Sequence, residues 1–173
     1  MRVDAEALAQ VAATGLAGIF AGASTYMSVA QQPALVETAS LAFQAAYFRR
    51  MYFYAARMQG PLAVGSGLSA LCVSLLQTQR GPRAGAPSLW LASGCLIGGI
   101  VPYTVLKMLA LNCQLVDSKE CLRCSQSLMQ EMLGRWGKLH AVRTGVSVMA
   151  FSAMLLAMAC GGDRAPARGV NVA

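Results

Sequence analysis

Hydrophobic positions along the chain fall into four long runs without a charged residue, and segments that contain the charged residues separate them. The runs cover residues 7–36, 58–79, 84–106 and 144–162. A bilayer has a hydrocarbon core of about 30 Å, which an α-helix crosses with roughly 20 residues. Each run is long enough to cross it, and a core helix of a water-soluble protein seldom stays free of charge over such a length. The pattern therefore predicts four transmembrane helices.

Turn-forming residues set the limits of the expected helices. We predict spans over about 7–30, 62–77, 89–111 and from about 144 to near residue 160. Pro102 lies inside the third span and should kink it. Amphipathic helices are expected over about 35–58 and 117–138, in the two longer connections. The predicted fold is all-α, a four-helix transmembrane bundle with amphipathic helical connections.

The same pattern predicts one domain and a tail. Residues 1–160 are expected to form a single four-helix membrane domain. The C-terminal residues 161–173 are expected to be flexible, because GGDRAPARGVNVA contains too few apolar residues to build a core. Trp90, at the beginning of the third span, is expected at the membrane–water interface, where tryptophan is enriched.

Composition and charge agree with a membrane protein. Of the 173 residues, 56% are hydrophobic and 12% are charged, whereas soluble domains have about a quarter charged residues. The net charge of +7 comes from basic residues that flank apolar spans, where membrane lipid is a commoner partner than nucleic acid. Lys and Arg are more numerous in the longer connections, which favours a cytoplasmic or matrix location for them. We expect a multi-pass integral membrane protein, of the mitochondrial inner membrane if the source is eukaryotic.

Two polar and aromatic helix faces are expected on the same side of the membrane. One carries Trp136, His140, Arg143 and Ser147, and the other carries Tyr47, Arg50, Tyr54 and Arg57. Intervals of three and four residues place each set on one face of a helix. If the faces meet, they line a cavity suited to a flat phenolic or anionic amphiphile. In the alternative interpretation, the arginines extend to lipid headgroups and the aromatic rings form an ordinary interfacial belt.

The six cysteines fall into two groups. Three lie in predicted spans, where a free thiol behaves as a small hydrophobic side chain: Cys72, Cys95 and Cys160. The others, Cys113, Cys121 and Cys124, lie in the third connection. The sequence CLRC is compatible with a redox pair or with part of a zinc site that needs a further ligand such as His140. Two unpaired cysteines on a short helix are the favoured interpretation, so no metal site is predicted.

Three segments resemble the anthrone-oxygenase-like family of small four-span membrane proteins. They are RMQGPL before the second span, VPYTVLKMLALNCQLVD through the third, and LGRWGKLHAVRT, the most specific, at the beginning of the fourth. The positions that match the family signature are Asn112, Leu115, Asp117, Arg135, Trp136, Leu139, His140, Arg143 and Thr144. The resemblance extends from about Gly15 to Met158. The segment ALNCQLVDSKECLRC departs from the usual Pro-Thr-Asn start and has additional cysteines.

The resemblance implies cofactor-independent oxidation of anthrones to anthraquinones, as in the characterised members. An anthrone anion reduces O₂ itself, so no cofactor is expected. The expected catalytic residues are His140 and Arg143, because a neutral imidazole accepts a proton near neutral pH and a guanidinium stabilises the anion. The expected substrate-binding residues are Trp136, Tyr54, Arg57, Arg50 and Asn112.

Two other classes of function also fit the sequence. The chain fits a non-catalytic accessory subunit of a larger membrane assembly, for example a mitochondrial respiratory complex, in which protein partners cover its apolar faces. It also fits a carrier that binds a lipid or a quinone without reacting with it. An aromatic or quinone-like small molecule is therefore a candidate partner in the enzymatic and in the carrier interpretation.

Overall fold

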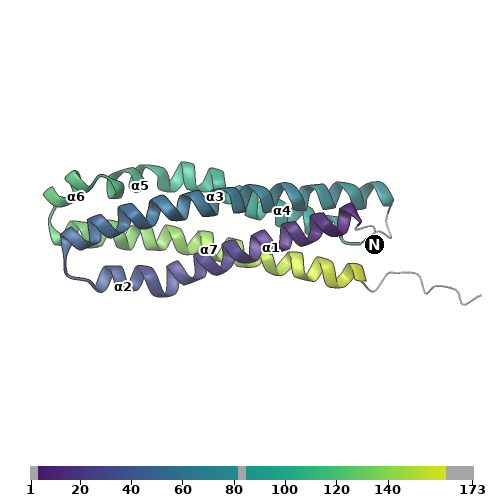
Figure 1. The fold of residues 1–173 in the computed structure, drawn as a ribbon, viewed down its shortest axis with the longest axis horizontal. Helices are drawn as coiled ribbons and strands as arrows, with labels where there is room; N and C mark the ends of the chain where they lie inside the picture. The colour runs from purple at the N-terminus through teal and green to yellow at the C-terminus, as the bar shows by residue number, and fades with distance from the viewer. Residues whose placement is uncertain (1–3, 82–84, 163–173) are drawn as a thin grey trace, which may run out of the picture.

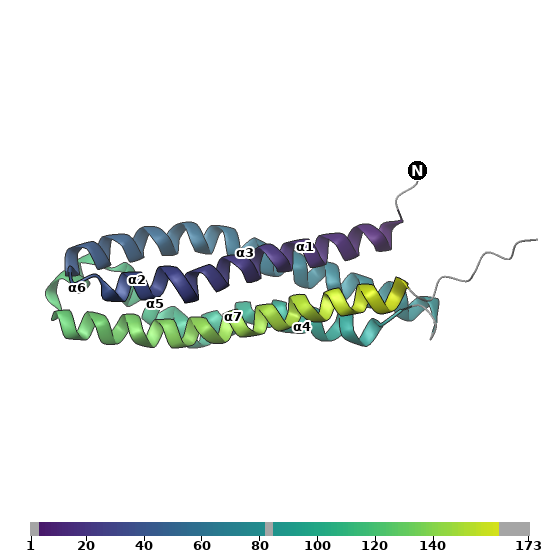
Figure 2. The ribbon, with the colours of Figure 1, turned by 90° about the horizontal axis from the view of Figure 1, so that it is seen from below.

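The computed structural model describes residues 4–81 and 85–162, and its helices form four rods that run along one long axis (Figures 1 and 2). The first rod contains α1 (Ala5–Tyr26), the π-helical segment η1 (Met27–Gln31) and α2 (Gln32–Glu37). The second rod is α3 (Leu41–Arg80). The third contains α4 (Pro87–Tyr103), the π-helical segment η2 (Thr104–Met108) and α5 (Leu109–Val116). The short helix α6 (Ser118–Arg123) connects it to the fourth rod, α7 (Gln126–Gly162).

All four rods are long and apolar enough to cross a membrane. The candidate spans are Ala5–Glu37, Leu41–Arg80, Pro87–Val116 and Gln126–Cys160. The beginning of α1 and the end of α7 lie at the same end of the bundle in both views, as an even number of spans requires (Figures 1 and 2). The predicted all-α, four-helix transmembrane bundle is therefore confirmed, and it is the fold of a multi-pass integral membrane protein.

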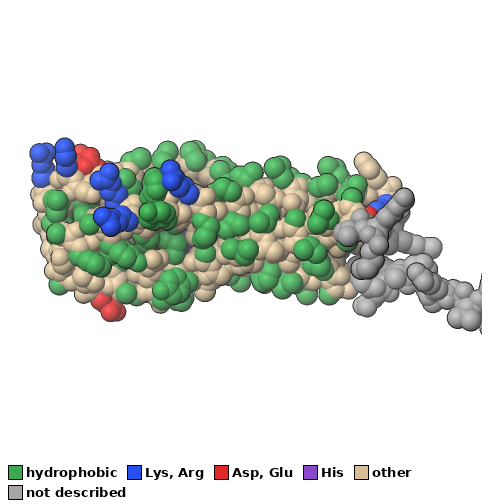
Figure 3. Space-filling model, viewed as in Figure 1, with side chains coloured by type: hydrophobic (Ala, Val, Ile, Leu, Met, Phe, Trp, Pro, Cys, Tyr) green, Lys and Arg blue, Asp and Glu red, His purple; other side chains and the backbone are tan. Residues whose placement is uncertain are grey.

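The bundle is about twice as long as a bilayer's hydrocarbon core is thick. The 40 residues of α3 correspond to about 60 Å of helix, against about 30 Å of hydrocarbon. The transmembrane half, as we define it, consists of residues 5–26, 58–80, 87–106 and 144–160, which lie largely within the charge-free runs. The projecting half consists of residues 27–57 and 107–143. It carries most of the described charged side chains, which gather towards the α6 end in Figure 3.

The two halves have different cores. In the transmembrane half, six of the twelve buried core residues that the structure describes are alanines. Small residues let helices approach closely, and a Cβ added to Gly94 would lie 3.2 Å from the backbone oxygen of Gly67. The core of the projecting half contains larger side chains, among them Phe48, Leu133 and Trp136.

Helix α3 is continuous through Pro61, which lies between the amphipathic helix and the second span that the sequence pattern predicts. The expectation of an amphipathic helix ending near residue 58 and a separate span beginning near residue 62 is wrong. Pro61 lacks an N–H group and removes one helical hydrogen bond. However, Phe48 before it and Ala70 after it are both buried against neighbouring rods. This packing holds the two segments on one axis.

Two rods contain a π-helical segment near the junction of the two halves. Segment η1 interrupts the first rod, and η2 begins two residues after Pro102. Proline cannot donate a hydrogen bond to the preceding turn, so the irregularity predicted at Pro102 takes the form of a π-helical segment. Such segments frequently occur at functional sites, which directs attention to this junction.

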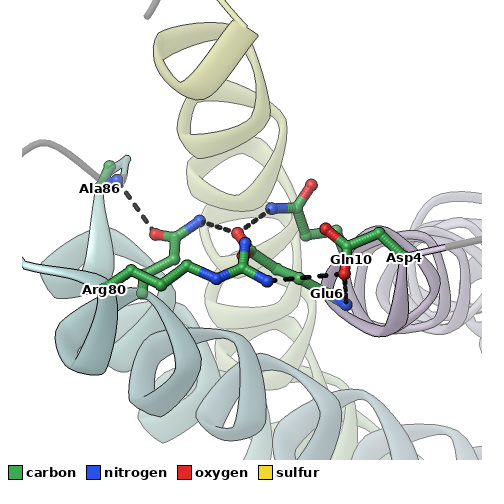
Figure 4. A network of polar contacts seen from close by, with 6 residues as sticks. Asp4, Glu6, Gln10, Arg80 and Ala86 are labelled. Carbon is green, nitrogen blue, oxygen red and sulfur yellow. Dashed lines mark hydrogen bonds and ion pairs between the residues drawn. The ribbon is translucent and has the colours of Figure 1, made fainter. Parts of the chain in front are cut away.

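A polar network joins the rods at the other end of the transmembrane half (Figure 4). The carboxylate of Glu6, which is only 7% exposed, accepts hydrogen bonds from Gln77 at 2.8 Å and from Gln10 at 3.0 Å. It also forms an ion pair with Arg80. The side-chain oxygen of Gln77 accepts a hydrogen bond from the backbone N–H of Ala86 at 3.1 Å. The network fixes the beginning of α1 against the end of α3.

Trp90 lies in the first turn of α4 (Pro87–Tyr103). Its side chain is 0% exposed and packs in the core of the transmembrane half. It therefore faces the bundle and not the surrounding lipid, and its location at the depth of the membrane–water interface stays a prediction.

The predicted flexible tail covers residues 161–173. Helix α7 continues as far as Gly162, and residues 163–173 lie outside the described residues. The tail and the division at residue 160 thus stay predictions.

Candidate functional site

A cavity of about 180 Å³ lies where the two cores meet. Phe20 and Ile100 of the transmembrane core line it, together with Met27 and Trp136 of the projecting core. The polar part of its lining consists of Tyr52, Gln59, Thr104, His140 and Arg143. Met27 belongs to η1 and Thr104 to η2. The cavity therefore coincides with the irregular backbone at the junction of the two halves.

A chain of hydrogen bonds holds one ring nitrogen of His140. Its Nδ1 lies 3.0 Å from Ser28 Oγ, which lies 2.7 Å from Thr144 Oγ1. The hydroxyl of Thr144 also reaches the backbone oxygen of Ser24 at 3.1 Å. When Nδ1 carries the proton, each group donates to the next and the last hydroxyl donates to a carbonyl oxygen. In this tautomer no donor of the chain lacks an acceptor.

The other ring nitrogen of His140, Nε2, is buried and has no hydrogen-bond partner among the described residues. The side chain is 1% exposed and lines the cavity. In the tautomer just described, Nε2 carries no proton and presents a lone pair. The opposite tautomer would bury an N–H donor without an acceptor, which native structures rarely do. The geometry therefore favours a proton acceptor in the cavity lining.

Trp136 fixes the plane of the imidazole ring. The indole and the ring of His140 are stacked, with centroids 4.7 Å apart and an angle of 25° between the planes. The indole Nε1 donates to Asn112 Oδ1 at 2.9 Å, and Asn112 in turn lies 3.5 Å from the hydroxyl of Tyr52. Asn112 therefore has no direct hydrogen bond to the imidazole. It binds the indole that is stacked on the ring of His140.

Arg143 brings a positive charge to the cavity and forms no ion pair with the acidic residues that the structure describes. One terminal nitrogen donates to Gln59 Oε1 at 2.8 Å, and Gln59 donates to the sulfur of Met27 at 3.3 Å. The guanidinium carbon lies 5.7 Å from the ring centroid of Phe20. Its buried Nε has no partner among the described residues. Arg143 is half-buried, and a cation with a buried, unused donor is costly unless an anion or a developing negative charge meets it.

The structure does not bring Arg50, Tyr54 and Arg57 into this cavity. Tyr54 is 69% exposed, and the Arg57 guanidinium lies 3.9 Å from the ring centroid of Phe53 on the outer surface of α3. Aromatic residues occur on both faces of this helix, and Tyr52 is on the face that turns inward. The expectation that the Arg50–Arg57 face lines the His140 cavity therefore differs from the arrangement observed.

Sequence reasoning missed three polar residues of the site as functional candidates, namely Ser28, Gln59 and Tyr52. A weak signal for Ser28 exists, because Ser24 and Ser28 are four residues apart inside an apolar run. Tyr52 and Gln59 are seven residues apart, which places them on one helix face. Thr144 appeared only as a position of the family signature.

The cysteines lie away from the cavity and are unpaired. None of the six is in a disulfide, and no cluster of metal-binding side chains occurs within residues 4–81 and 85–162. Cys121 is buried, and its thiol lies 3.4 Å from the backbone oxygen of Gln114. Burial raises the pKa of the Cys121 thiol, and the neighbouring Cys124 and Asp117 raise it further. A thiol in this setting is a poor nucleophile near neutral pH.

The residues around the cavity lie largely in a segment that matches a known family. Residues 48–153, more than half of the chain, match the family model described as anthrone oxygenase. The chain belongs to the anthrone oxygenase family. No curated protein and no solved structure matches it. The match to the anthrone oxygenase model includes His140, Arg143 and Gln59, whereas Ser28, in the first rod, lies before it.

Proposed function

We propose that this protein oxidises an anthrone-type substrate to the corresponding quinone with O₂ and without a cofactor. The observation that carries the proposal is the unpartnered Nε2 of His140 in the lining of a cavity that also contains Arg143. Membership of the anthrone oxygenase family supports the choice of substrate class.

The reaction needs a base and a site for the resulting anion. Anthrone has a methylene carbon opposite its carbonyl group, and loss of a proton gives an anion whose charge rests largely on the carbonyl oxygen. This anion transfers an electron pair to O₂ as a carbon–oxygen bond forms, and protonation gives a hydroperoxide. Loss of the remaining proton from that carbon and cleavage of the O–O bond then give the second carbonyl group and water. O₂ supplies both the oxidising power and the new oxygen atom.

The side chains of the cavity match these demands. Nε2 of His140 accepts the first proton, while Ser28 and Thr144 hold the ring through Nδ1. The guanidinium of Arg143 stabilises the negative charge that develops on the carbonyl oxygen. Trp136 sets the plane of the imidazole and offers an aromatic wall to a flat substrate.

The test is anthrone-dependent O₂ uptake by the purified full chain in mild detergent. We expect the wild-type protein to consume O₂ and produce the quinone. His140→Gln should lower turnover by about 10² to 10⁴, because this is the typical contribution of a positioned proton-transfer group. The matched control is Lys138→Gln, since Lys138 is an exposed side chain of the same helix, and it should leave turnover unchanged.

Full activity of His140→Gln would exclude His140 as the base. Absence of O₂ uptake by the wild-type chain with every anthrone tested would contradict the proposed reaction and favour the role of an accessory subunit. In that case His140→Gln should leave the yield of a larger assembly unchanged, whereas deletion of the chain should lower that yield.

A further inference from the structure

A second binding site is indicated on the outer surface of α3, in a groove of about 690 Å³. The groove is lined by Arg49, Arg50, Arg57, Phe53, Tyr54 and Val116, among others. It shares Tyr52 and Ala56 with the lining of the cavity that contains His140, but none of its arginines lines that cavity, and no step of the proposed reaction uses them.

The positive charge of this groove is not balanced by the protein. No acidic side chain lines it, and within residues 4–81 and 85–162 the ion pairs involve neither Arg49, Arg50 nor Arg57. In Figure 3, basic side chains gather over the projecting part of the bundle, on the face where α3 is seen. A cluster of uncompensated guanidiniums attracts an anion, and the planar guanidinium binds phosphate with two parallel hydrogen bonds.

The spacing of charges along α3 indicates that the arginines lie near the depth of lipid headgroups. Arg57 is the last charged residue before the charge-free run 58–79 of α3. Its guanidinium lies over Phe53, one turn further into the projecting half, which is the direction in which a long basic side chain leaves the hydrocarbon. Arg50 is seven residues earlier, about 10 Å along the helix. The headgroup layer is about 5–8 Å thick on each side of the bilayer. The separation of Arg50 and Arg57 along the helix is therefore sufficient to span this layer.

An apolar stripe continues from the groove along α3. Val64, Leu68 and Leu75 are all exposed large hydrophobic residues. They follow Arg57 at intervals of seven, four and seven residues, which places them on the same helix face as Arg57. A molecule with its anionic group at the arginines therefore has an apolar surface along which a hydrocarbon chain can lie.

We propose that this face of α3 is a binding site for an anionic phospholipid. The headgroup phosphate is held by Arg50 and Arg57, with Arg49 at the rim, and an acyl chain lies along Val64, Leu68 and Leu75. The proposal thus combines two observations on one face of α3, the guanidiniums outside any ion pair of the described residues and the aligned apolar stripe. The proposal does not depend on the reaction assigned to the His140 cavity.

The proposal is tested by native mass spectrometry of the purified full chain with phosphatidylglycerol and phosphatidylcholine of identical acyl chains. The wild-type protein should retain phosphatidylglycerol in preference to phosphatidylcholine. One basic residue near a membrane surface changes binding by about fivefold, so Arg57→Gln should weaken phosphatidylglycerol binding about fivefold. The double variant Arg50→Gln/Arg57→Gln should weaken it by roughly 25-fold.

The matched control is Arg123→Gln, which removes an exposed positive charge from α6, outside the groove. It should leave the lipid preference unchanged, and circular dichroism should show unchanged helix content for all variants. Equal binding of the two lipids by the wild-type chain would overturn the proposal. An equal loss in Arg123→Gln would also overturn it, because the effect would then come from net charge alone.

The same variants distinguish a lipid from an anionic substrate at the groove. If the groove binds lipid, Arg50→Gln/Arg57→Gln should leave the KM for an anthrone unchanged. A raised KM together with an unaltered lipid preference would contradict the proposal and assign the groove to substrate capture.

Discussion

The transmembrane and projecting halves of the bundle contain segments of the same four rods but are packed in different ways. The transmembrane half has a core rich in alanine, and its helices approach closely where Gly67 meets Gly94. The projecting half buries large side chains such as Phe48 and Leu133. In lipid there is little hydrophobic driving force between helices, so close contact of small residues dominates. Outside the hydrocarbon, burial of large apolar side chains drives association.

The cavity lies where these two kinds of packing meet. Small and bulky core side chains favour different distances between helices, and the π-helical segments η1 and η2 of the first and third rods lie near the junction of the two cores. Residues from both cores line the cavity at this junction, together with the polar side chains of His140 and Arg143. The difference between the halves thus explains why a polar site can exist inside an otherwise apolar bundle.

The largest effect is expected from a truncation in the projecting core. Phe48 is 0% exposed and packs edge-on against Trp136, so Phe48→Ala should lower the free energy of unfolding by about 3–5 kcal/mol. Denaturant titration in detergent micelles measures it. The matched control is Phe43→Ala, since Phe43 is an exposed residue of the same helix. An equal loss in both variants would mean that the projecting half has no tight core.

An intermediate effect is expected from enlarging a small residue in the transmembrane core. In Gly94→Ala the new methyl group would press on the backbone of Gly67, and overpacking of this kind costs about 1–3 kcal/mol. Gly99→Ala is the matched control on the same helix, because a Cβ there meets nothing within 4 Å. It should be neutral or stabilising, since alanine favours helix more than glycine does. Greater stability of Gly94→Ala than of Gly99→Ala would refute close packing between α3 and α4.

The smallest effect is expected on the pH dependence of stability, through the thiol of Cys121 in the projecting half. Its pKa is raised above the ordinary value of 9.0, so it stays protonated in the folded chain at a pH where the unfolded chain has begun to ionise. The folded state then binds more protons than the unfolded state, and stability falls as pH rises above about 9. The stability advantage of the wild type over Cys121→Ala should therefore shrink between pH 8 and about 10. A constant difference would show that the thiol ionises equally in both states.

Much of the fold is predictable from charge spacing alone. The charge-free runs predict the four spans because a charge inside hydrocarbon is expensive. Each run overlaps one of the four rods, but the second and fourth rods begin well before their runs, at Leu41 and Gln126. The continuity of α3 through Pro61 could not be predicted, because it depends on packing against other rods on both sides of the proline. The burial of Trp90 in the bundle core could not be predicted for a related reason, since it depends on which face of α4 turns towards the other rods.

The site is only partly predictable. Intervals of four and three residues place Trp136, His140 and Arg143 on one face of α7, and all three line the cavity. Helix α3 has aromatic residues on both faces, so its sequence does not reveal which face turns inward. The bond between Ser28 and His140 joins residues that are 112 positions apart, and only the relative placement of the rods brings them together.

The most direct measurement of His140 as a base separates proton removal from oxidation. The wild-type chain is incubated anaerobically with an anthrone in D₂O, and the exchange of the methylene hydrogens is followed by NMR spectroscopy. Without O₂ the anion returns to the anthrone, so exchange above the uncatalysed rate reports the base alone. We expect the wild-type protein and Lys138→Gln to accelerate this exchange, and His140→Gln to reduce it by about 10² to 10⁴. Exchange by His140→Gln at the wild-type rate would contradict the assignment of the base.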